Sequence, residues 1–341
     1  MARAAYAASL ELIQAAAKRI APYAKVTPVL TCSTLDALAA RKLHFKCEVF
    51  QKGGAFKFRG ACNAVFSLPE ADAKKGVVTH SSGNHAGALA LAAKTRGIPS
   101  YIVVPWGAPE CKLAAIKTYG GAITQCEATV PAREAAAAKI QEETGAALVP
   151  PYNDGAVMAG QGTISLELLQ QVPHLDAIVV PISGGGMISG IALAAKGINP
   201  KVKVFAAEPV GRDGCGADVA ASKAAGRLVA DMAPPNTIAD GLRAKMGDLT
   251  WPVVRDLVDG VIPVEDRQIV AAMRLIYERM KVVVEPSGAA GLAAVLSPHF
   301  KDDPALAECK NVGIVLCGGN LDLGALFEAY DRVLQETPQG Q

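Results

Sequence analysis

Residues 77–105 read VVTHSSGNHAGALALAAKTRGIPSYIVVP. Two short apolar runs, at 77–80 and 101–105, enclose an alanine-rich stretch at 86–97. Short apolar runs bounded by turn residues are typical of buried strands, whereas a longer alanine-rich stretch favours a helix. The segment therefore predicts a strand–helix–strand unit, and such a connection places its two strands parallel.

The same alternation continues in both directions along the chain. Because the apolar runs are short and uninterrupted, they predict parallel sheets with helices on both faces, the α/β class. Glycine-rich turns follow several of these strands, and open α/β sheets bind ligands at that edge. We expect further strands at 44–50, 122–127, 147–151, 177–183, 202–209 and 311–319. We expect further helices at 59–68, 111–120, 132–145, 160–172, 186–198, 269–280 and 288–300.

Length and composition exclude several classes of protein. The 341 residues suggest about two domains, and 51% apolar against 19% charged residues excludes a disordered chain. A net charge of +2 predicts no binding to nucleic acid or to an anionic membrane. The most membrane-like window, 177–195, contains a proline and three consecutive glycines, so it predicts a strand, a turn and a helix rather than a membrane span.

The N-terminus and the cysteines favour a cytoplasmic protein. Residues 1–20 carry Glu11 and lack a continuous apolar run, so we expect no signal peptide. Eight cysteines are dispersed without a CxxC spacing, which predicts reduced thiols rather than a zinc or redox motif.

KGGAFKFRG at 52–60 places Lys57 between Phe56 and Phe58, at the boundary of a predicted strand and helix. An apolar setting lowers the pKa of a lysine, which is what an amine needs to form a Schiff base. The alternative is a surface lysine whose aliphatic stem covers apolar side chains. The motif alone leaves both interpretations open.

Two further motifs favour anion binding. THSSGNH at 79–85 and SGGGMISG at 183–190 each join a strand to a helix, where backbone N–H groups and the helix dipole attract an anion. Three glycines also let the backbone wrap a phosphate. The first motif is equally expected of an ordinary helix cap, with His85 packed or capping rather than a base. The second can also be a tight turn.

A fourth motif, CGGN at 317–320, follows the apolar run NVGIVL. Cys317 would either place its sulfur at a ligand atom or be an ordinary buried cysteine. Taken alone, the motif favours the buried cysteine.

Together these motifs resemble the fold type II pyridoxal-phosphate enzymes, such as tryptophan synthase β chains, threonine dehydratases and serine racemases. The similarity is greatest to plant-type serine racemases and runs from about residue 10 to 330. It is carried by QKGGAFKFRGACNAV, VVTHSSGNHA, PISGGGMISG, NTIADGLRA, GDLTWPVVRDLVD, EPSGAAGLAAVLS and GGNLDLG. The resemblance implies bound pyridoxal 5′-phosphate and two domains, each with a mostly parallel sheet flanked by helices. The large domain would comprise 1–67 and 154–341, and the small domain 68–153.

By the same resemblance, Lys57 would form the Schiff base and Phe56 would lie beside the cofactor ring. Asn84 would bond the ring hydroxyl, and Asn153 would lie nearby. Cys317 would face the pyridine nitrogen, where a neutral partner favours proton transfer and β-elimination over transamination. The phosphate loop would comprise Ser183, Gly184, Gly185, Gly186 and Met187, in which the family commonly has a fourth glycine in place of the serine.

Ser82 separates racemisation from dehydration in this family. Serine racemases carry serine there, on the cofactor face opposite the lysine, whereas many threonine dehydratases carry alanine. Racemisation needs an acid/base group on each face, and Lys57 and Ser82 would supply the two. The resemblance therefore implies interconversion of L- and D-serine with dehydration as a side activity; a serine/threonine dehydratase is the alternative. The substrate would be held by Ser81, Ser82, Asn84, His85 and Arg133.

The resemblance also implies effector sites and a homodimer. The family's divalent metal site has the pattern Glu-Pro-x-x-Ala-Asp-Asp, whereas this chain offers Glu208, Arg212, Asp213 and Gly214. Gly214 supplies no carboxylate, so we expect weaker binding of Mg²⁺ or Ca²⁺, with Asp213 as a substitute ligand. An ATP site at a dimer interface is implied in the mammalian-type racemases. The positions that match its contacts are Lys52, Tyr119, Lys281 and Asn320.

Overall fold

The computed structural model describes residues 6–81, 83–108, 110–212, 214, 216–229 and 231–335. Within these residues, ten strands form two sheets in the orders β1-β2-β10-β7-β8-β9 and β5-β4-β3-β6. The larger sheet contains β1 (Val29–Leu30), β2 (Lys42–Cys47), β7 (Ala177–Pro181), β8 (Lys203–Pro209), β9 (Gly260–Val264) and β10 (Asn311–Leu316). The smaller sheet contains β3 (Val77–Thr79), β4 (Ser100–Pro105), β5 (Ala122–Cys126) and β6 (Ala147–Leu148). The pairings are parallel except between β1 and β2, which confirms the α/β class.

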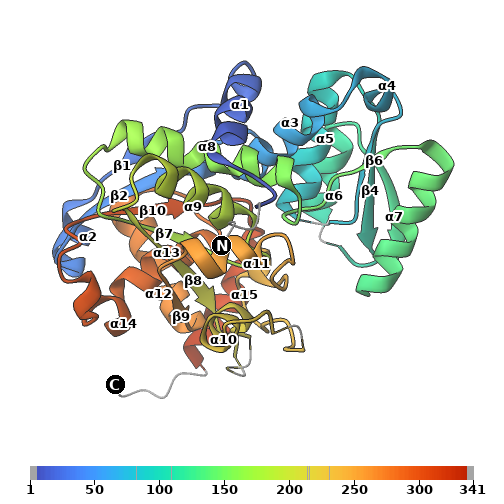
Figure 1. Cartoon of the computed structure of the whole chain (residues 1–341). Helices are drawn as coiled ribbons and strands as arrows, with labels where there is room; N and C mark the ends of the chain where they lie inside the picture. The colour runs from blue at the N-terminus through green and yellow to red at the C-terminus, as the bar shows by residue number, and fades with distance from the viewer. Residues whose placement is uncertain are drawn as a thin grey trace.

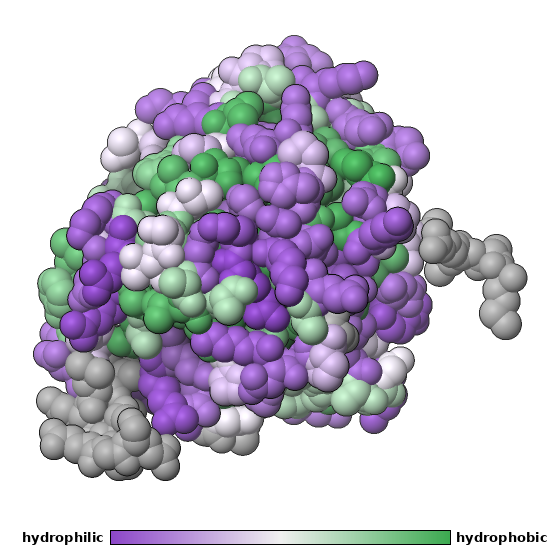
Figure 2. Space-filling model, turned by 90° about the vertical axis from the view of Figure 1, so that its left-hand side faces the viewer, coloured by the Kyte–Doolittle hydropathy of each residue, from purple (hydrophilic) through white to green (hydrophobic). Residues whose placement is uncertain are grey.

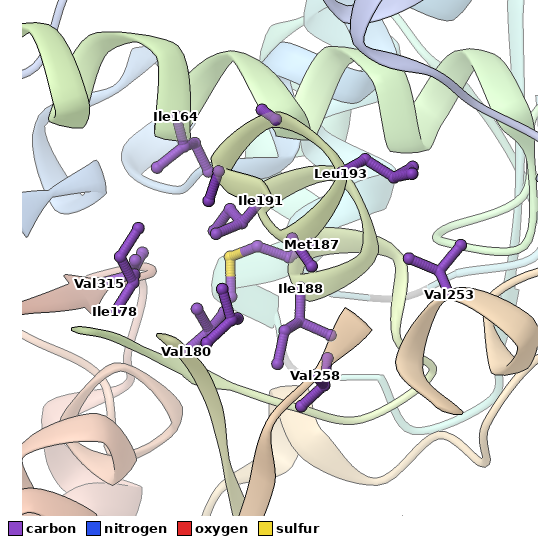
Figure 3. Packing of buried hydrophobic residues seen from close by; sticks show 14 of the residues in the cluster. Ile164, Ile178, Val180, Met187, Ile188, Ile191, Leu193, Val253, Val258 and Val315 are labelled. Carbon is purple, nitrogen blue, oxygen red and sulfur yellow. The ribbon is translucent and has the colours of Figure 1, made fainter. Parts of the chain in front are cut away.

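Helices cover both faces of the larger sheet, as its uninterrupted apolar strands predict. In β7, Ile178 and Val180 pack into one core cluster, while Ala177 and Val179 pack into the other. Figure 3 shows the first cluster, in which Ile191 lies between Ile164 and Val180. The helices on this side are α1 (Leu10–Ile20), α8 (Gly155–Gln171), α9 (Gly186–Ile198) and α11 (Trp251–Leu257). Those on the other side include α2 (Ser33–Ala39), α12 (Asp266–Leu275) and α13 (Pro286–Leu296).

The smaller sheet is covered in the same way and lies at one side of the molecule (Figure 1). Val77 and Ile102 pack with α3 (Lys57–Ser67), α5 (Asn84–Arg96) and α6 (Glu110–Thr118), and Val78 and Val103 pack with α7 (Val130–Thr144). Domain boundaries at 67/68 and 153/154 stay a prediction, because α3 packs against both α5 and α8. The remaining helices are α4 (Glu70–Ala73), α10 (Asp218–Ala225), α14 (Pro298–Lys301) and α15 (Leu323–Gln335).

Several predicted boundaries were wrong: α8 begins at Gly155 rather than at 160, and β7 and β10 end at Pro181 and Leu316 rather than at 183 and 319. Four more have a clear local cause or a change of helix type. The strand at 44–50 ends at Cys47, and a 3₁₀ turn follows at Glu48–Phe50. The strand at 147–151 ends at Leu148, because two prolines without N–H groups follow. The helix at 269–280 becomes a π-helical turn from Ile276. The helix at 288–300 is divided at Ser297, whose hydroxyl accepts from the N–H of Phe300 and caps α14.

The helices that the structure describes include none that is both long and apolar enough to cross a membrane. Figure 2 shows a face on which hydrophilic residues surround scattered patches of hydrophobic ones.

Candidate active site

Lys57 is the first residue of α3 and is half-buried in the site. Nζ donates to the carbonyl oxygen of Pro151 at 2.6 Å and lies 5.0 Å from the centre of the Phe56 ring. Burial lowers the pKa of Lys57 to about 8, while the nearby Cys317 and Glu285 act in the opposite direction. A sizeable fraction of the amine is therefore neutral near pH 7 to 8, as a nucleophilic lysine requires.

The glycine turn between β7 and α9 forms a cradle of backbone amides. Gly185 has φ +90°, and it precedes α9 without a side chain that caps the helix. A Cβ on Gly184 would lie 2.4 Å from the ring of Tyr152, and one on Gly186 would lie 2.8 Å from the Tyr152 backbone. Only glycine fits this close approach, and the exposed N–H groups at the start of α9 suit a phosphate.

Residues 244–250 hold the glycine turn in place through hydrogen bonds. The hydroxyl of Ser183 accepts from the N–H of Ala244 at 2.8 Å, and Thr250 donates its hydroxyl to the carbonyl of Gly184 at 2.7 Å. Asn153 lies beside the same segment, since its side chain donates to Asp248 at 2.6 Å and accepts from the N–H of Leu249. Ser183 and Asn153 therefore shape the turn with their side chains. Met187 follows the turn and is buried.

Asn84 begins α5 and its carboxamide is held from two sides. Its Nδ2 donates to Oε1 of Glu285 at 2.8 Å, and its Oδ1 accepts from Nδ2 of Asn320 at 3.0 Å. Asn320 also donates to the carbonyl of Gly53 at 2.6 Å. These bonds join the segment before Lys57, the start of α5 and the chain after β10.

Cys317 lies at the end of β10 and is buried, with an exposed fraction of 3%. Its carbonyl accepts from the N–H of Phe56 at 2.9 Å, so the thiol belongs to the same site as Lys57. Burial, and next the carboxylate of Glu285, raises the pKa of the thiol well above its usual value. Cys317 therefore presents a neutral S–H group.

The side chains predicted to hold the substrate lie in different surroundings. Ser81 accepts from the N–H of Gly83 at 3.3 Å, and Ser82 lies outside the described residues. His85 is buried, with Nε2 2.9 Å from the carbonyl of Val149, which is the geometry of a packed histidine. Arg133 is half-buried in the first turn of α7.

Comparisons with known proteins agree with this geometry. Residues 20–318 match the family described as "Pyridoxal-phosphate dependent enzyme". The chain belongs to this family. It is 59% identical to a serine racemase of Arabidopsis thaliana, over 96% of this chain and 98% of that one. The solved structure of maize serine racemase has a TM-score of 0.91 and 56% identity, and the match covers 97% and 99% of the two chains. The solved structure of a threonine deaminase from the organism abbreviated T.th. has a TM-score of 0.85 and 40% identity, over 92% and 99%.

The residues of this pyridoxal-phosphate-dependent enzyme fit its cofactor. The cradle at the start of α9 suits the phosphate, and the amine of Lys57 lies beside an aromatic ring. Sequence reasoning missed two residues of the site, Tyr152 and Glu285. Tyr152 lies against Gly184. It could have been found in the sequence as the aromatic residue directly before Asn153. Glu285 had its signal in the EPSGAAG segment, which carries a charged residue before an otherwise apolar helix.

The predicted metal ligands do not form a ligand set in the described part of this enzyme. Oε1 and Oε2 of Glu208 accept from the N–H groups of Val219 and Ala220, both at 2.8 Å, at the start of α10. The Arg212 side chain lies 3.8 Å from Asp266, and Asp213 lies outside the described residues. The described residues contain no group of three His, Cys, Asp or Glu side chains that could hold a metal ion.

The four predicted nucleotide contacts are partly brought together. Asn320 bonds the carbonyl of Gly53, the residue after Lys52. Lys281 has φ +59°, and its amine donates to the carbonyl of Glu278. Tyr119 lies near Gly87 of α5, at 4.0 Å from the position of a Cβ there.

Proposed function

We propose that this chain interconverts L- and D-serine and also dehydrates serine to pyruvate and ammonia. The observation that carries this proposal is the placement of the Lys57 amine, which donates to the carbonyl of Pro151 and lies 5.0 Å from the centre of the Phe56 ring. Its pKa, which desolvation lowers to about 8, suits both Schiff-base formation and proton transfer. The similarity to serine racemases over almost the whole chain supports the choice of substrate. When bound, pyridoxal phosphate supplies an electron sink for the α-carbon of the amino acid.

Each residue of the site has a part in this proposal. Lys57 would hold the cofactor and would move a proton on one face of the substrate, and Ser82 would move it on the other. The N–H groups around Ser81 and Asn84 would bind the substrate carboxylate. The neutral Cys317 thiol would be the partner of the ring nitrogen and would leave it without a counter-charge, which limits side reactions. Arg133 would lie at the side-chain end of the substrate.

A serine/threonine dehydratase without racemisation is the second candidate, and the similarity to a threonine deaminase favours it. Chiral analysis of products from L-serine, D-serine, L-threonine and L-aspartate distinguishes the two. We expect D-serine and pyruvate from L-serine. Pyruvate without D-serine would favour the dehydratase instead. Lys57→Ala is the control, since it removes the amine and should abolish turnover of all four.

We propose a homodimer in the cytoplasm as the working state of the enzyme. Six cysteines are free, which supports a reducing compartment: Cys32, Cys47, Cys62, Cys126, Cys309 and Cys317. Leu323 and Phe327 lie four residues apart on one face of α15 with exposed fractions of 58% and 63%. An exposed apolar pair of this kind supports a face that a second subunit covers. The mass in solution of wild type and Phe327→Glu tests the dimer.

Two effectors complete the proposal. We expect Mg²⁺ or Ca²⁺ to bind weakly near Glu208, because Gly214 offers no carboxylate. Titration of either ion into a chelated sample, with Glu208→Ala as control, measures this; tight binding that survives in the variant would place the ion elsewhere. ATP would bind through Lys52, Tyr119, Lys281 and Asn320, and loss of its effect on the rate in Lys281→Ala tests that site.

A further inference from the structure

Arg59 is fully buried and is held by two carboxylates. Its Nε and Nη2 donate to Oε2 and Oε1 of Glu48, at 2.7 and 2.8 Å. Its Nη1 and Nη2 also donate to Oε1 and Oε2 of Glu167, at 2.6 and 2.8 Å. Both contacts are two-bond forks, the geometry in which a guanidinium holds a carboxylate in one orientation. The side chains of Arg59 and Glu48 are 1% and 0% exposed.

A second buried cation completes the network. Lys46 Nζ donates to Oε2 of Glu167 at 2.6 Å, to Gln171 at 3.0 Å and to the carbonyl of Thr27 at 2.8 Å. Thr27 donates its hydroxyl to Oε1 of Glu48 at 2.6 Å. Two cations therefore face two anions, and the network is neutral as a whole.

The network lies on the side of α3 opposite the Lys57 amine. Lys57 and Arg59 are two residues apart in the first turn of α3, so their side chains point about 200° apart around the helix axis. The Lys57 amine reaches the carbonyl of Pro151 on the side of the site. Arg59 reaches Glu48 and Glu167 on the opposite side.

The three segments that surround Lys57 meet in this network. Glu48 lies in the turn that leads from β2 toward Lys57. Glu167 lies on α8, which begins shortly after Pro151, the residue that accepts from the amine. Arg59 lies on α3 itself. A change in the network therefore moves the helix turn that carries Lys57 relative to both of its supports.

We propose that Arg59 is a positioning residue, whose two forks hold the first turn of α3 so that the Lys57 amine points toward the proposed cofactor site. This inference rests on the assignment of Lys57 to the cofactor. Buried ion pairs contribute little net stability, because desolvation offsets their attraction and well-packed apolar groups often do as well. Apolar contacts, however, do not fix the orientation of a helix turn as two-bond forks do. Orientation matters because a reacting group displaced by about 1 Å can lose about 100-fold in rate.

Arg59→Lys tests the inference, because it keeps the positive charge and loses both forks. The first measurement is the rate at which pyridoxal phosphate forms its imine with the full chain, followed by visible absorbance against pH. We expect the pH midpoint to move up from about 8 toward the usual lysine value, because the amine can turn toward water. The second is steady-state kinetics of the holoenzyme with L-serine. We expect kcat to fall about 10- to 100-fold with KM changed by less than about 3-fold.

Arg41→Lys is the matched control. Arg41 also donates through its whole guanidinium, but to the carbonyls of Cys309, Ala39 and Leu306, which lie outside α3. Its variant should lose thermal stability while its pH midpoint and kcat stay at the wild-type values. Glu48→Gln is a second test that does not depend on whether Arg59→Lys folds. It keeps the shape of one carboxylate partner of Arg59 and should shift the pH midpoint in the same direction as Arg59→Lys.

The outcomes separate this inference from the proposed function. Borohydride reduction and peptide mass analysis of the wild type locate the imine, and a lysine other than Lys57 would overturn both. If the imine is on Lys57 and either network variant keeps the wild-type midpoint and kcat, only the positioning role is lost. An equal shift in Arg41→Lys would also overturn it, since the effect would then follow stability alone.

Discussion

The carboxamide of Asn84 donates to both carboxylate oxygens of Glu285, at 2.8 and 3.1 Å. Asn84 begins a helix that covers the smaller sheet, and Glu285 directly precedes α13, which covers the larger one. The bond therefore links the two sheets across the site. Glu285 is buried, and its charge acts on the pKa of both Lys57 and Cys317.

Glu285→Gln separates the charge of this residue from its hydrogen bond. A glutamine oxygen still accepts from Asn84, but the negative charge that raises the pKa of Lys57 is gone. We therefore expect the pKa of Lys57 to fall below about 8. The pH dependence of imine formation measures the pKa of Lys57. Glu208→Gln is the control, because it removes a buried carboxylate near α10 and should leave the midpoint unchanged. A midpoint that rises in Glu285→Gln would contradict the prediction.

The apolar setting of Lys57 at the start of a helix could be predicted from the sequence because it is local. Two flanking phenylalanines, two preceding glycines and a strand end all lie within a few residues of it. The glycine cradle was predictable for the same reason, since a strand, three glycines and a helix follow one another along the chain. The α/β class followed from short apolar strands, which need cover on both faces.

The partners of these residues could not be predicted in the same way. Asn84 and Glu285 are 201 positions apart, and Arg59 and Glu167 are 108 apart. Such pairs depend on which strands are neighbours, and the order β2-β10-β7 brings the start, end and middle of the chain together. Local periodicity does not determine that order. The contact of Tyr152 with Gly184 escaped prediction for the same reason.

Gly184→Ala should weaken cofactor binding, because the added methyl group overlaps the Tyr152 ring. Overpacking of this kind costs about 1–3 kcal/mol, so we expect the affinity for pyridoxal phosphate to fall about 5- to 150-fold. Titration of the cofactor by absorbance measures the change. Gly87→Ala is the control, since its Cβ meets only Tyr119 at 4.0 Å. In a Tyr152→Ala background the effect of Gly184→Ala should shrink; an undiminished loss would assign it to the backbone.

His85 should make the folded state sensitive to acid. Burial, and next the charge of Lys57, lowers its pKa to about 3, whereas the unfolded chain has the ordinary value of 6.5. The unfolded state therefore binds the proton more tightly, and stability present above pH 6.5 is lost as the pH falls toward 3. Each pH unit in that window is worth about 1.4 kcal/mol.

His85→Gln tests this dependence. The glutamine amide can still donate to the carbonyl of Val149, but it does not titrate. Between pH 6.5 and 5, the wild type should lose about 2 kcal/mol more of its free energy of unfolding than the variant. Denaturant unfolding at both pH values gives the difference. Equal losses in the two proteins would show that His85 binds its proton as readily when folded as when unfolded.

Ser82→Ala should separate racemisation from dehydration. If Lys57 works on one face of the substrate and Ser82 on the other, the variant loses one of two acid/base groups. Racemisation needs both, and a lost acid/base group typically costs about 10²–10⁴-fold. Dehydration of L-serine needs only the proton taken by Lys57, followed by loss of the hydroxyl group. It should therefore survive better than conversion of L- to D-serine.

D-serine gives the sharper result in the same variant, because in the two-base mechanism its α-proton would face Ser82. Formation of pyruvate from D-serine should fall together with racemisation, while pyruvate from L-serine continues. The measurement is D-serine and pyruvate from L-serine, and pyruvate from D-serine, in wild type and Ser82→Ala. An equal loss of all three rates would mean that Ser82 positions the substrate rather than moving its proton. Unchanged racemisation would exclude a two-base mechanism with Ser82 as the second base.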